Sequence, residues 1–347
     1  MKLFNKKEKP TIKRILIIRF SSIGDIVLTT PVIRAVKRRY PDAALHFLTK
    51  KNFKQVTIYN PFIDTIHTLE EDIDITINEL KKYKFDYIAD LQKNFRSRRI
   101  VDALNVPSAS FPKLNIRKWL YTNFKINTLP NRSIVERYFE AVKKIGVTND
   151  GEGLNYFIPE EKETKQDDIP MSHWAGYVGC VIGGSFATKK MPVQKWQEFV
   201  AKCPYPVILL GGPEDCEEGE QIVLQQEGKV YNACGKFNLT ESADLVRRAR
   251  VVVTNDTGLM HVAAAFKKPI VSLWGNTTPQ MGMFPYYGFN DLKENIAPQL
   301  EIVEVNNLSC RPCSKLGHKQ CPKKHFKCMN NIAIDQIVST VERFWTL

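Results

Sequence analysis

The chain has 347 residues, which is room for about two domains, and 43% of them are hydrophobic, enough to support sizeable cores. Its formal net charge of +13 suits a surface that attracts polyanions such as nucleic acid, anionic lipid head groups or phosphorylated glycans. No apolar run approaches the roughly 18 residues of a membrane span, and the basic first segment lacks the apolar stretch of a secretory signal. We therefore expect a cytoplasmic protein that can rest on a membrane surface.

Strands and helices alternate through the first half of the chain, which predicts a parallel, doubly wound sheet. The expected elements are strands over 14–20, 44–48, 62–68 and 85–89, a helix over 74–83 and an amphipathic helix over 133–145. Pro31 interrupts the helical run that follows the first strand. We therefore expect either a kink there or a short helix with a restart near Thr30.

The loop after the first strand, Ser21 to Asp25, holds a single glycine, whereas a dinucleotide-binding loop needs three. This argues against an NAD site. Asp25 lies at the mouth of the predicted sheet, where ligands bind in such folds, and its carboxylate suits either a general base or a helix N-cap. Because a helix N-terminus favours the ionised carboxylate, a base at this point would act mainly through its position.

Residues 91–125 combine many basic and aromatic side chains with one acid, Asp102. The basic residues are Lys93, Arg96, Arg98, Arg99, Lys113, Arg117, Lys118 and Lys125. This composition is typical of a surface that binds a phosphorylated amphiphile or a membrane interface. It also occurs in nucleic-acid binders, where aromatic rings stack on bases, and a solvated helix with a buried aromatic stripe would produce it as well.

A polar, acidic segment over 147–173 marks the expected boundary between two domains. A second alternation of strands and helices follows it. The expected strands are 176–182, 206–210, 229–233, 251–253 and 270–273, and the expected helices are 192–201, 216–227, 240–249, 259–266 and 332–345. The two halves therefore share one architecture.

The loop 183–192 has the composition of an anion site. Its two glycines open the backbone, Ser185 and Thr188 supply hydroxyls, and Lys189 or Lys190 supplies a cation. Together these groups suit a diphosphate, although the spacing of a Walker A loop is missing.

The helix expected after the strand 251–253 begins at a polar turn. Gly258 lets a ligand approach the backbone, and the free N–H groups and positive dipole end of the helix suit a diphosphate. Asp256 suits helix capping or a ligand hydroxyl, and His261 suits a satisfied core histidine or a site residue. An ordinary capped βαβ unit would give the same pattern.

Four of the eight cysteines form the cluster Cys310-x2-Cys313-x7-Cys321-x6-Cys328 near the C-terminus. They are zinc-ligand residue types, but the spacing of the second half does not follow a standard zinc knuckle. A structural zinc, a disulfide and reduced packed thiols therefore stay open. A catalytic metal is not expected, because no carboxylate joins the set.

Two long motifs carry a family resemblance. The run ILIIRFSSIGDIVLTTPVIRAVKRRYPDAALHFLTK resembles the N-terminal signature of the ADP-heptose:lipopolysaccharide heptosyltransferases, glycosyltransferase family 9, and VVVTNDTGLMHVAAAFKKPIVSLWGNTTP is similar to their second signature. The resemblance implies an α/β GT-B architecture, with two Rossmann-like doubly wound parallel-sheet domains facing a central cleft. It implies an acceptor domain over 1–160, a nucleotide-sugar domain over 170–330, and a C-terminal helix over 331–347 that packs back on the N-terminal domain.

The resemblance further implies an inverting transfer that needs neither a metal ion nor a cofactor, with an ADP-activated sugar as substrate. The family's catalytic aspartate falls on Asp25. The implied donor-binding residues are Ser185, Thr188, Lys189, Glu214, Asp256, Thr257, Gly258 and His261. Glu217 or Glu218 would also fit the place of Glu214 near the nucleotide ribose, and Met191 stands where family members often carry an aromatic residue.

The implied acceptor is a phosphorylated, lipid-linked sugar, which would place the protein on the inner face of the bacterial inner membrane. The expected acceptor-binding residues are Ser22, Gly24, Arg96, Arg98, Arg99, Arg117 and Lys118. Two other functions stay open: a different nucleotide-sugar enzyme of the same shape, such as an epimerase, and a nucleic-acid binder. The sequence contains no compact nucleic-acid motif, so we expect no nucleic-acid partner.

Overall fold

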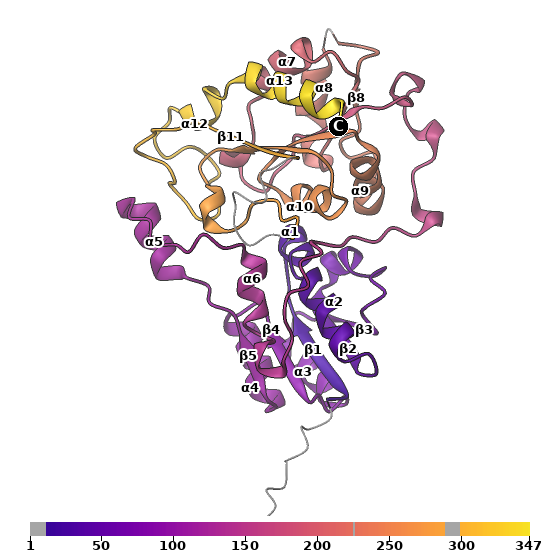
Figure 1. The fold of residues 1–347 in the computed structure, drawn as a ribbon, viewed down its shortest axis with the longest axis vertical. Helices are drawn as coiled ribbons and strands as arrows, with labels where there is room; N and C mark the ends of the chain where they lie inside the picture. The colour runs from indigo at the N-terminus through magenta and orange to yellow at the C-terminus, as the bar shows by residue number, and fades with distance from the viewer. Residues whose placement is uncertain (1–11, 225, 289–298) are drawn as a thin grey trace, which may run out of the picture.

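Two parallel sheets, one in each half of the chain, form the framework of the protein (Figure 1). The computed structural model describes residues 12–224, 226–288 and 299–347. The N-terminal sheet has the strand order β3-β2-β1-β4-β5 with parallel pairing throughout. Its strands are β1 (Arg14–Ile18), β2 (Ala44–Lys50), β3 (Thr65–Leu69), β4 (Tyr87–Asp90) and β5 (Ser108–Ser110).

The central strand β1 is apolar at successive positions because both of its faces are covered. Ile15 and Ile17 join the core on one side of the sheet, and Leu16 and Ile18 join the core on the other. The helical segments of this half are α1 (Ile23–Val27), α2 (Thr30–Arg39), η1 (Lys51–Val56), α3 (Ile73–Lys81), α4 (Phe95–Leu104), α5 (Asn115–Phe124), α6 (Ile134–Phe139) and η2 (Lys143–Ile145).

The restart expected near Pro31 is confirmed. The helix α1 ends at Val27, and α2 begins at Thr30 with Pro31 in its first turn. Proline is tolerated in the first helical turn because the N–H groups there have no partner within the helix.

The helix predicted over 133–145 is wrong in length, because α6 ends at Phe139. The Tyr87 hydroxyl donates a 2.8 Å hydrogen bond to the Ala141 carbonyl, which a continuing helix would need for its own ladder. The chain proceeds instead in tighter turns with i−3 hydrogen bonds as far as Gly146.

The C-terminal sheet has the order β11-β10-β9-β6-β7-β8, again with parallel pairing. Numbered within its own half, this is the 3-2-1-4-5-6 order of dinucleotide-binding Rossmann folds. Its strands are β6 (Val178–Val181), β7 (Val207–Leu210), β8 (Val230–Asn232), β9 (Val251–Asn255), β10 (Ile270–Trp274) and β11 (Leu300–Glu304). The predicted pair of Rossmann-like domains is therefore confirmed.

The helices of this half are α7 (Val193–Lys202), α8 (Cys216–Val223), α9 (Leu239–Arg248), α10 (Gly258–Ala265), α12 (Lys327–Asn330) and α13 (Ile334–Trp345). Short 3-10 turns lie between them: η3 (Glu160–Lys162), η4 (Gln166–Asp168), η5 (Met171–His173), η6 (Ala187–Lys189), η7 (Pro213–Asp215) and η8 (Pro279–Met281). None of the helices within the described residues is long and apolar enough to cross a membrane.

The prediction that the C-terminal helix packs back on the N-terminal domain is wrong. The helix α13 contacts α7 and the strands β9, β10 and β11 of its own domain. Its apolar face, with Ile337 and Val341, shares a core with Val253 and Leu273. Helices α7 and α13 together cover this side of the second sheet, where the buried strand side chains need an apolar partner.

The segment that connects the two domains is clamped onto α2. Arg34, with 1% of its side chain exposed, donates to Asp150 (2.7 Å) and to the Gly153 carbonyl (3.0 Å). The Asn155 backbone N–H donates to the Thr30 hydroxyl at 2.9 Å. The connector therefore belongs to the N-terminal domain as far as Asn155.

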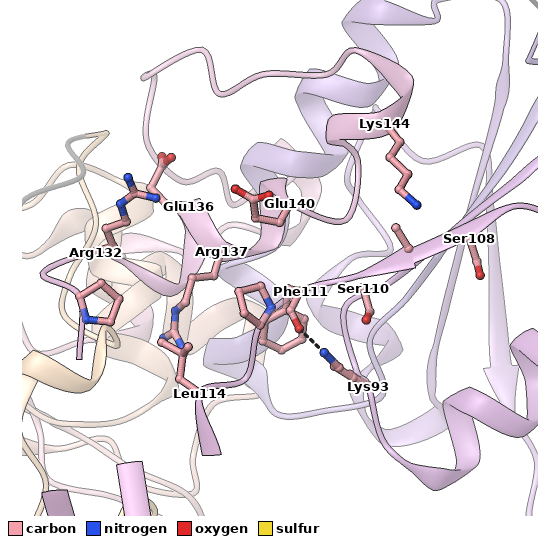
Figure 2. A pocket seen from close by; sticks show the side chains of 13 residues that line it. Lys93, Ser108, Ser110, Phe111, Leu114, Arg132, Glu136, Arg137, Glu140 and Lys144 are labelled. Atoms are coloured by element: carbon pink, nitrogen blue, oxygen red, sulfur yellow. Dashed lines mark hydrogen bonds between the residues drawn. The ribbon is translucent and has the colours of Figure 1, made fainter. Parts of the chain in front are cut away.

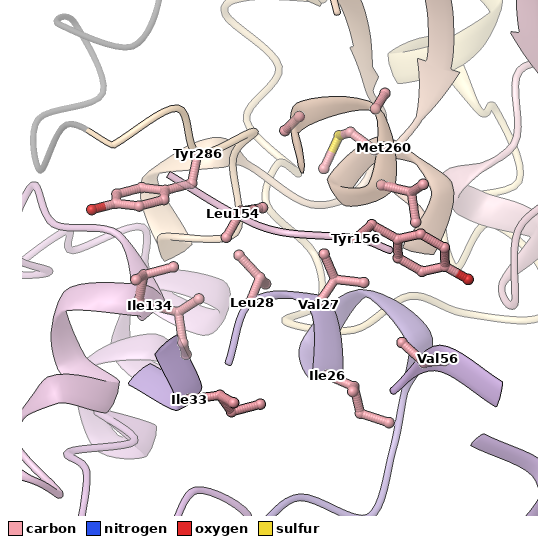
Figure 3. Packing of buried hydrophobic residues seen from close by; sticks show 14 of the residues in the cluster. Ile26, Val27, Leu28, Ile33, Val56, Ile134, Leu154, Tyr156, Met260 and Tyr286 are labelled. Carbon is pink, nitrogen blue, oxygen red and sulfur yellow. The ribbon is translucent and has the colours of Figure 1, made fainter. Parts of the chain in front are cut away.

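The two domains meet where α1 crosses α10. Val27 and Leu28 from the end of α1 lie opposite Met260 of α10, with Leu154 and Tyr156 of the connector beside them (Figure 3). These side chains form one continuous apolar cluster with the core of each domain. The carboxyl ends of β1 and β9 are thereby brought to the same junction.

Candidate active site

Asp25 lies in the first turn of α1, directly after the carboxyl end of β1. One of its carboxylate oxygens lies 2.6 Å from the Arg19 guanidinium, and the other accepts hydrogen bonds from the Ser22 hydroxyl (3.0 Å) and backbone N–H (3.3 Å). Arg19 is held in turn by the Leu91 and Ser21 carbonyls at 2.6 and 2.9 Å. About a quarter of the Asp25 side chain, 24%, stays exposed, so a ligand can reach it.

The environment of Asp25 sets its charge. Burial alone would raise the pKa of this carboxyl, but the Arg19 guanidinium and the Ser22 hydrogen bonds hold the pKa below its usual value. Asp25 is therefore ionised at neutral pH and able to accept a proton from a group placed against it.

The close contact between the domains is made by two glycines. A Cβ on Gly24 would lie 2.6 Å from His261 Cδ2 and 3.2 Å from Gly258 Cα, and a Cβ on Gly258 would lie 2.9 Å from Ile23 Cβ. Any larger residue at either position would push the helices apart. Gly24, in the loop after β1, and Gly258, at the start of α10, thus allow α1 and α10 to touch.

His261 is buried at this contact, with 2% exposure, and faces Asp25 and Asp256 electrostatically. Burial lowers the pKa of its imidazole to about 4, against the attraction of the two carboxylates. Its Nδ1 has no hydrogen-bond partner within the described ranges. A neutral imidazole with one open nitrogen therefore sits between the two domains.

On the C-terminal side, Asp256 and Lys189 form a tight pair at the start of α10. The Lys189 ammonium lies 2.6 Å from the Asp256 carboxylate, which also accepts a hydrogen bond from the Thr277 hydroxyl at 2.8 Å. Thr257 is the N-cap residue of α10, and its buried hydroxyl has no partner among the residues the structure describes. A cation, an open hydroxyl and a helix N-terminus thus converge, as the sequence predicted for an anion site.

Asn255, which suits a helix N-cap by residue type and is not among the predicted site residues, positions this loop. It is fully buried, its amide donates to the Ile182 carbonyl at 2.9 Å, and its oxygen accepts from the Met191 N–H at 3.1 Å. The end of β9 is thereby tied to both ends of the loop 183–192. A polar residue that ends a wholly apolar strand was the available signal.

The other predicted donor residues of the loop 183–192 lie differently. Thr188 is buried, and its hydroxyl exchanges hydrogen bonds with the His318 backbone at 2.8 and 3.1 Å, so it anchors the cysteine-rich segment. Ser185 is exposed. Lys190 points to Asp215 and Glu218, at 2.8 and 2.6 Å.

The three glutamates considered for contact with the ribose differ in the contacts that they make. Glu218 is engaged by Lys190 at 2.6 Å. Glu217 is exposed on α8, whereas the exposed Glu214 folds its carboxylate over Gly212, at the carboxyl end of β7. Because ligands of such sheets bind at the carboxyl ends of the strands, Glu214 has the best position of the three.

A group of cations lies on the N-terminal side of the site, and two of them, Lys113 and Lys118, interact electrostatically with Asp25. Lys113 and Lys118 come from the segment before and within α5, Arg137 from α6, and Lys315 from the other domain. Burial, and after it the nearby Arg137, lower the pKa of Lys118 to about 7, although Asp25 acts in the opposite direction. An anion bound among these cations would relieve their mutual repulsion.

Arg137, like Lys315, is a member of this group that the sequence analysis missed. It is 4% exposed, one nitrogen donates to the Met281 carbonyl at 3.0 Å, and Nε and Nη1 have no hydrogen-bond partner in the described parts of the chain. It lines an open cavity of about 590 Å³ beside Leu114 and Phe111 (Figure 2). An arginine within the apolar run of α6 was the signal in the sequence.

The remaining acceptor predictions divide into two sets. Ser22 and Gly24 lie beside Asp25, as expected. On α4, Arg98 and Arg99 pair with Asp102 (3.6 Å) and Asp74 (2.7 Å) on the surface, and Arg96 is exposed. On α5, Arg117 is exposed and donates to the Thr128 carbonyl at 3.2 Å. The structure thus brings Lys118, but not the arginines of α4, into the group around Asp25.

The four clustered cysteines are free thiols packed near one another. Burial, followed by the neighbouring Cys310 and Cys321, raises the pKa of the Cys313 thiol, and burial chiefly raises that of Cys328 to about 12. Over the residues that the structure describes, no three His, Cys, Asp or Glu side chains are arranged to hold a metal ion. The segment instead packs against the donor side through Thr188 and through a 3.1 Å bond from the Cys313 N–H to the Asn276 carbonyl.

The chain is similar to known proteins in both sequence and fold. The family model described as "Glycosyltransferase family 9 (heptosyltransferase)" matches residues 76–327. The chain is 25% identical to lipopolysaccharide heptosyltransferase 2 of Salmonella typhimurium over 299 residues, which covers 77% of this chain and 84% of that protein.

Two solved structures share the fold over nearly the whole chain. One is a glycosyl transferase family 9 protein from Veillonella parvula, with a TM-score of 0.73, 23% identity, and 96% of this chain and 97% of that chain covered. The other is the ADP-heptose lps heptosyltransferase II of E. coli, with a TM-score of 0.68, 18% identity, and 96% and 98% covered.

Proposed function

Because the chain belongs to glycosyltransferase family 9, the heptosyltransferase family, we propose that it transfers a heptose from an ADP-heptose to a lipopolysaccharide core acceptor. The names of the similar proteins from Salmonella typhimurium and E. coli support this choice of substrates. The observation that carries the proposal is the contact of Gly24 with Gly258, which sets an ionised carboxylate against a cation and a helix N-terminus of the other domain.

In the proposed reaction, Asp25 accepts the proton of the acceptor hydroxyl while that oxygen attacks the anomeric carbon of the donor. The bond from this carbon to the diphosphate breaks, and ADP leaves with the electron pair. Attack from the face opposite the leaving group inverts the anomeric configuration. The lowered pKa of Asp25 means that it acts through its position beside the hydroxyl more than through its basicity.

The leaving diphosphate would bind at the start of α10. Lys189, the open hydroxyl of Thr257 and the N–H groups near Gly258 can stabilise its growing charge without a metal ion. Asp256 holds Lys189 in place before the donor arrives. Glu214 is proposed to contact the nucleotide ribose from the end of β7.

The acceptor would bind on the N-terminal side. Lys113, Lys118, Arg137 and Lys315 offer an unbalanced positive charge beside Asp25, which suits the acidic groups of a phosphorylated sugar. We infer that the protein works in the cytoplasm, on the inner face of the inner membrane where such a lipid-linked acceptor is exposed.

The test is transfer to a heptose-deficient lipopolysaccharide precursor, with Asp25→Asn as the main variant. We expect turnover to fall by about 10²–10⁴-fold, the usual worth of a general base, while affinity for the donor stays unchanged. Asp102→Asn, on the exposed surface of α4, is the matched control and should keep wild-type turnover. Near-normal turnover of Asp25→Asn would show that the base is assigned wrongly.

Three further measurements test the details of the proposal. The anomeric configuration of the product, read by NMR, reports inversion directly, and transfer should survive removal of divalent metal by a chelator. Donor incubated alone should be hydrolysed only slowly. An epimerase would instead convert the donor sugar in the absence of acceptor.

A further inference from the structure

Two stretches of the chain contain no acidic residue. Residues 103–135 carry five Lys or Arg and no Asp or Glu, and residues 305–334 carry six and none. The first stretch lies in the N-terminal domain and includes α5, and the second is the cysteine-rich segment of the C-terminal domain. Both charge imbalances are far larger than that of the chain as a whole.

The two stretches lie side by side in the folded protein. The Lys125 ammonium, at the end of α5, donates to the Pro312 carbonyl at 2.8 Å and to the Cys310 carbonyl at 3.3 Å. The charge of Lys315 is felt by Lys113 and Lys118. Basic residues of the two domains therefore lie next to each other.

The helix α5 adds apolar side chains that nothing in the described structure covers. Its side chains are half-buried or exposed, and Ile116, Trp119 and Phe124 are 77%, 55% and 59% exposed. Figure 1 shows α5 standing away from the body of the molecule. Leu316, 57% exposed, places a further apolar side chain on the cysteine-rich segment.

The apolar residues of α5 lie on one face. The apolar face begins at Ile116 and continues three, four and eight residues later with Trp119, Leu120 and Phe124. Lys118 lies on the opposite side of the helix and interacts electrostatically with Asp25. The Trp119 and Phe124 rings meet edge to face, with centroids 5.3 Å apart. A helix with an apolar face and cations at its border is the pattern of an interfacial membrane helix.

We propose that α5 and the segment 315–327 form a docking surface for a lipid leaflet rich in anionic head groups, with Trp119 and Phe124 inserted among the acyl chains and Lys319, Lys323 and Lys324 on the head groups. We call this the docking surface. Its net positive charge disfavours pairing with a second copy of itself. The mutual packing of its two rings leaves them poorly arranged to stack on the bases of a nucleic acid. This inference rests on the proposed function in that a lipid-linked acceptor would be presented at the same leaflet.

The first experiment measures sedimentation of the full chain with vesicles of phosphatidylcholine, with and without phosphatidylglycerol. We expect binding to the anionic vesicles that weakens as salt is added. The triple variant Lys319→Gln, Lys323→Gln, Lys324→Gln should lose affinity by about fivefold for each lysine. The matched control removes three exposed lysines at the end of α3, through Lys81→Gln, Lys82→Gln and Lys84→Gln, and should bind as wild type.

The second experiment tests insertion. Trp119→Ser with Phe124→Ser should lower binding to anionic vesicles, whereas Met171→Ser, at a residue 74% exposed on the other domain, should not. Brominated lipids should quench tryptophan fluorescence in the wild type, and Trp119→Phe should remove most of that quenching. Both α5 variants should keep the wild-type thermal midpoint, because none of the replaced side chains is buried.

Three outcomes would overturn the inference. One is equal binding to neutral and anionic vesicles, and the second is binding that neither set of variants changes. The third is a concentration-dependent dimer that the α5 variants dissociate while vesicle binding stays intact. Transfer to a deacylated, water-soluble acceptor separates this inference from the proposed function. The variants of the docking surface should keep this transfer at the wild-type rate. If the wild type does not catalyse it, the proposed function is contradicted and the docking inference is not.

Discussion

Replacing Gly24 with alanine should disable the enzyme by separating its two domains at the site. The added Cβ would lie 2.6 Å from His261 Cδ2, whereas ordinary contact begins at 3.4 Å, so α1 and α10 must move apart by about 0.8 Å. The His261 ring is 2% exposed, and the added Cβ would also lie 3.2 Å from Gly258 Cα, so turning the ring alone does not relieve the crowding. Overpacking of this kind costs about 1–3 kcal/mol of stability.

The catalytic loss should exceed what the lost stability explains. A displacement near 1 Å between a base and its target can cost about 100-fold in rate, so we expect kcat to fall by about that factor in a transfer assay with both substrates saturating. Gly146→Ala is the control: its φ of 73° makes alanine strained by about 1–2 kcal/mol, but its Cβ would meet nothing within 4 Å. That variant should lose stability and keep kcat.

Two results would contradict a positioning role for the contact between Gly24 and α10. If Gly24→Ala retains kcat within twofold of wild type, or if Gly146→Ala loses as much activity, the glycine contact does not position the site. A second check uses the double variant Gly24→Ala, His261→Ala. Because His261→Ala removes the atom that would clash, the double variant should lose less stability than the sum of the losses of the two single variants.

Two other predictions concern acceptor and donor binding. Because the pKa of Lys118 is about 7, the ammonium that would bind the acceptor is lost as pH rises. We expect kcat/KM for the acceptor to fall between pH 6 and 8 in the wild type and to stay level in Lys118→Arg. A parallel fall in both proteins would contradict this assignment. Asn255→Ala should cost about 1–3 kcal/mol and raise the donor KM, because the loop 183–192 loses its tie to β9. Asn232→Ala, which removes a similarly buried and bonded amide at the end of β8, should cost comparable stability without changing the donor KM.

The elements that carry the site were well predicted, because the apolar runs and turn residues that define them are adjacent in the sequence. The continuous apolar runs of β1 and β9 are buried on both faces, and the single glycine and aspartate of the first loop lie where the strand ends. The edge strand β11 was missed because Glu301 interrupts its apolar residues and Glu304 ends them, so it lacks a continuous apolar run.

The parts that sequence reasoning could not supply depend on distant partners. The amphipathic pattern of α13 shows that it packs on something but not on which domain, and the uncovered face of the second sheet decides it. The closeness of Lys315 to Lys118 joins residues almost 200 positions apart. Thr188 has the residue type of a phosphate ligand, yet its hydroxyl is taken by a backbone that only the fold brings near.

The position of α13 has a consequence for how the molecule can be divided. With α13 kept on its own domain and the connector clamped to α2 as far as Asn155, the described chain passes from one domain to the other once. A break within the exposed turn Glu160–Lys162 would cut no strand or α-helix of either half. The protein is thus built so that two separately made polypeptides, each with a whole sheet, could assemble into one split enzyme through the contact of α1 with α10.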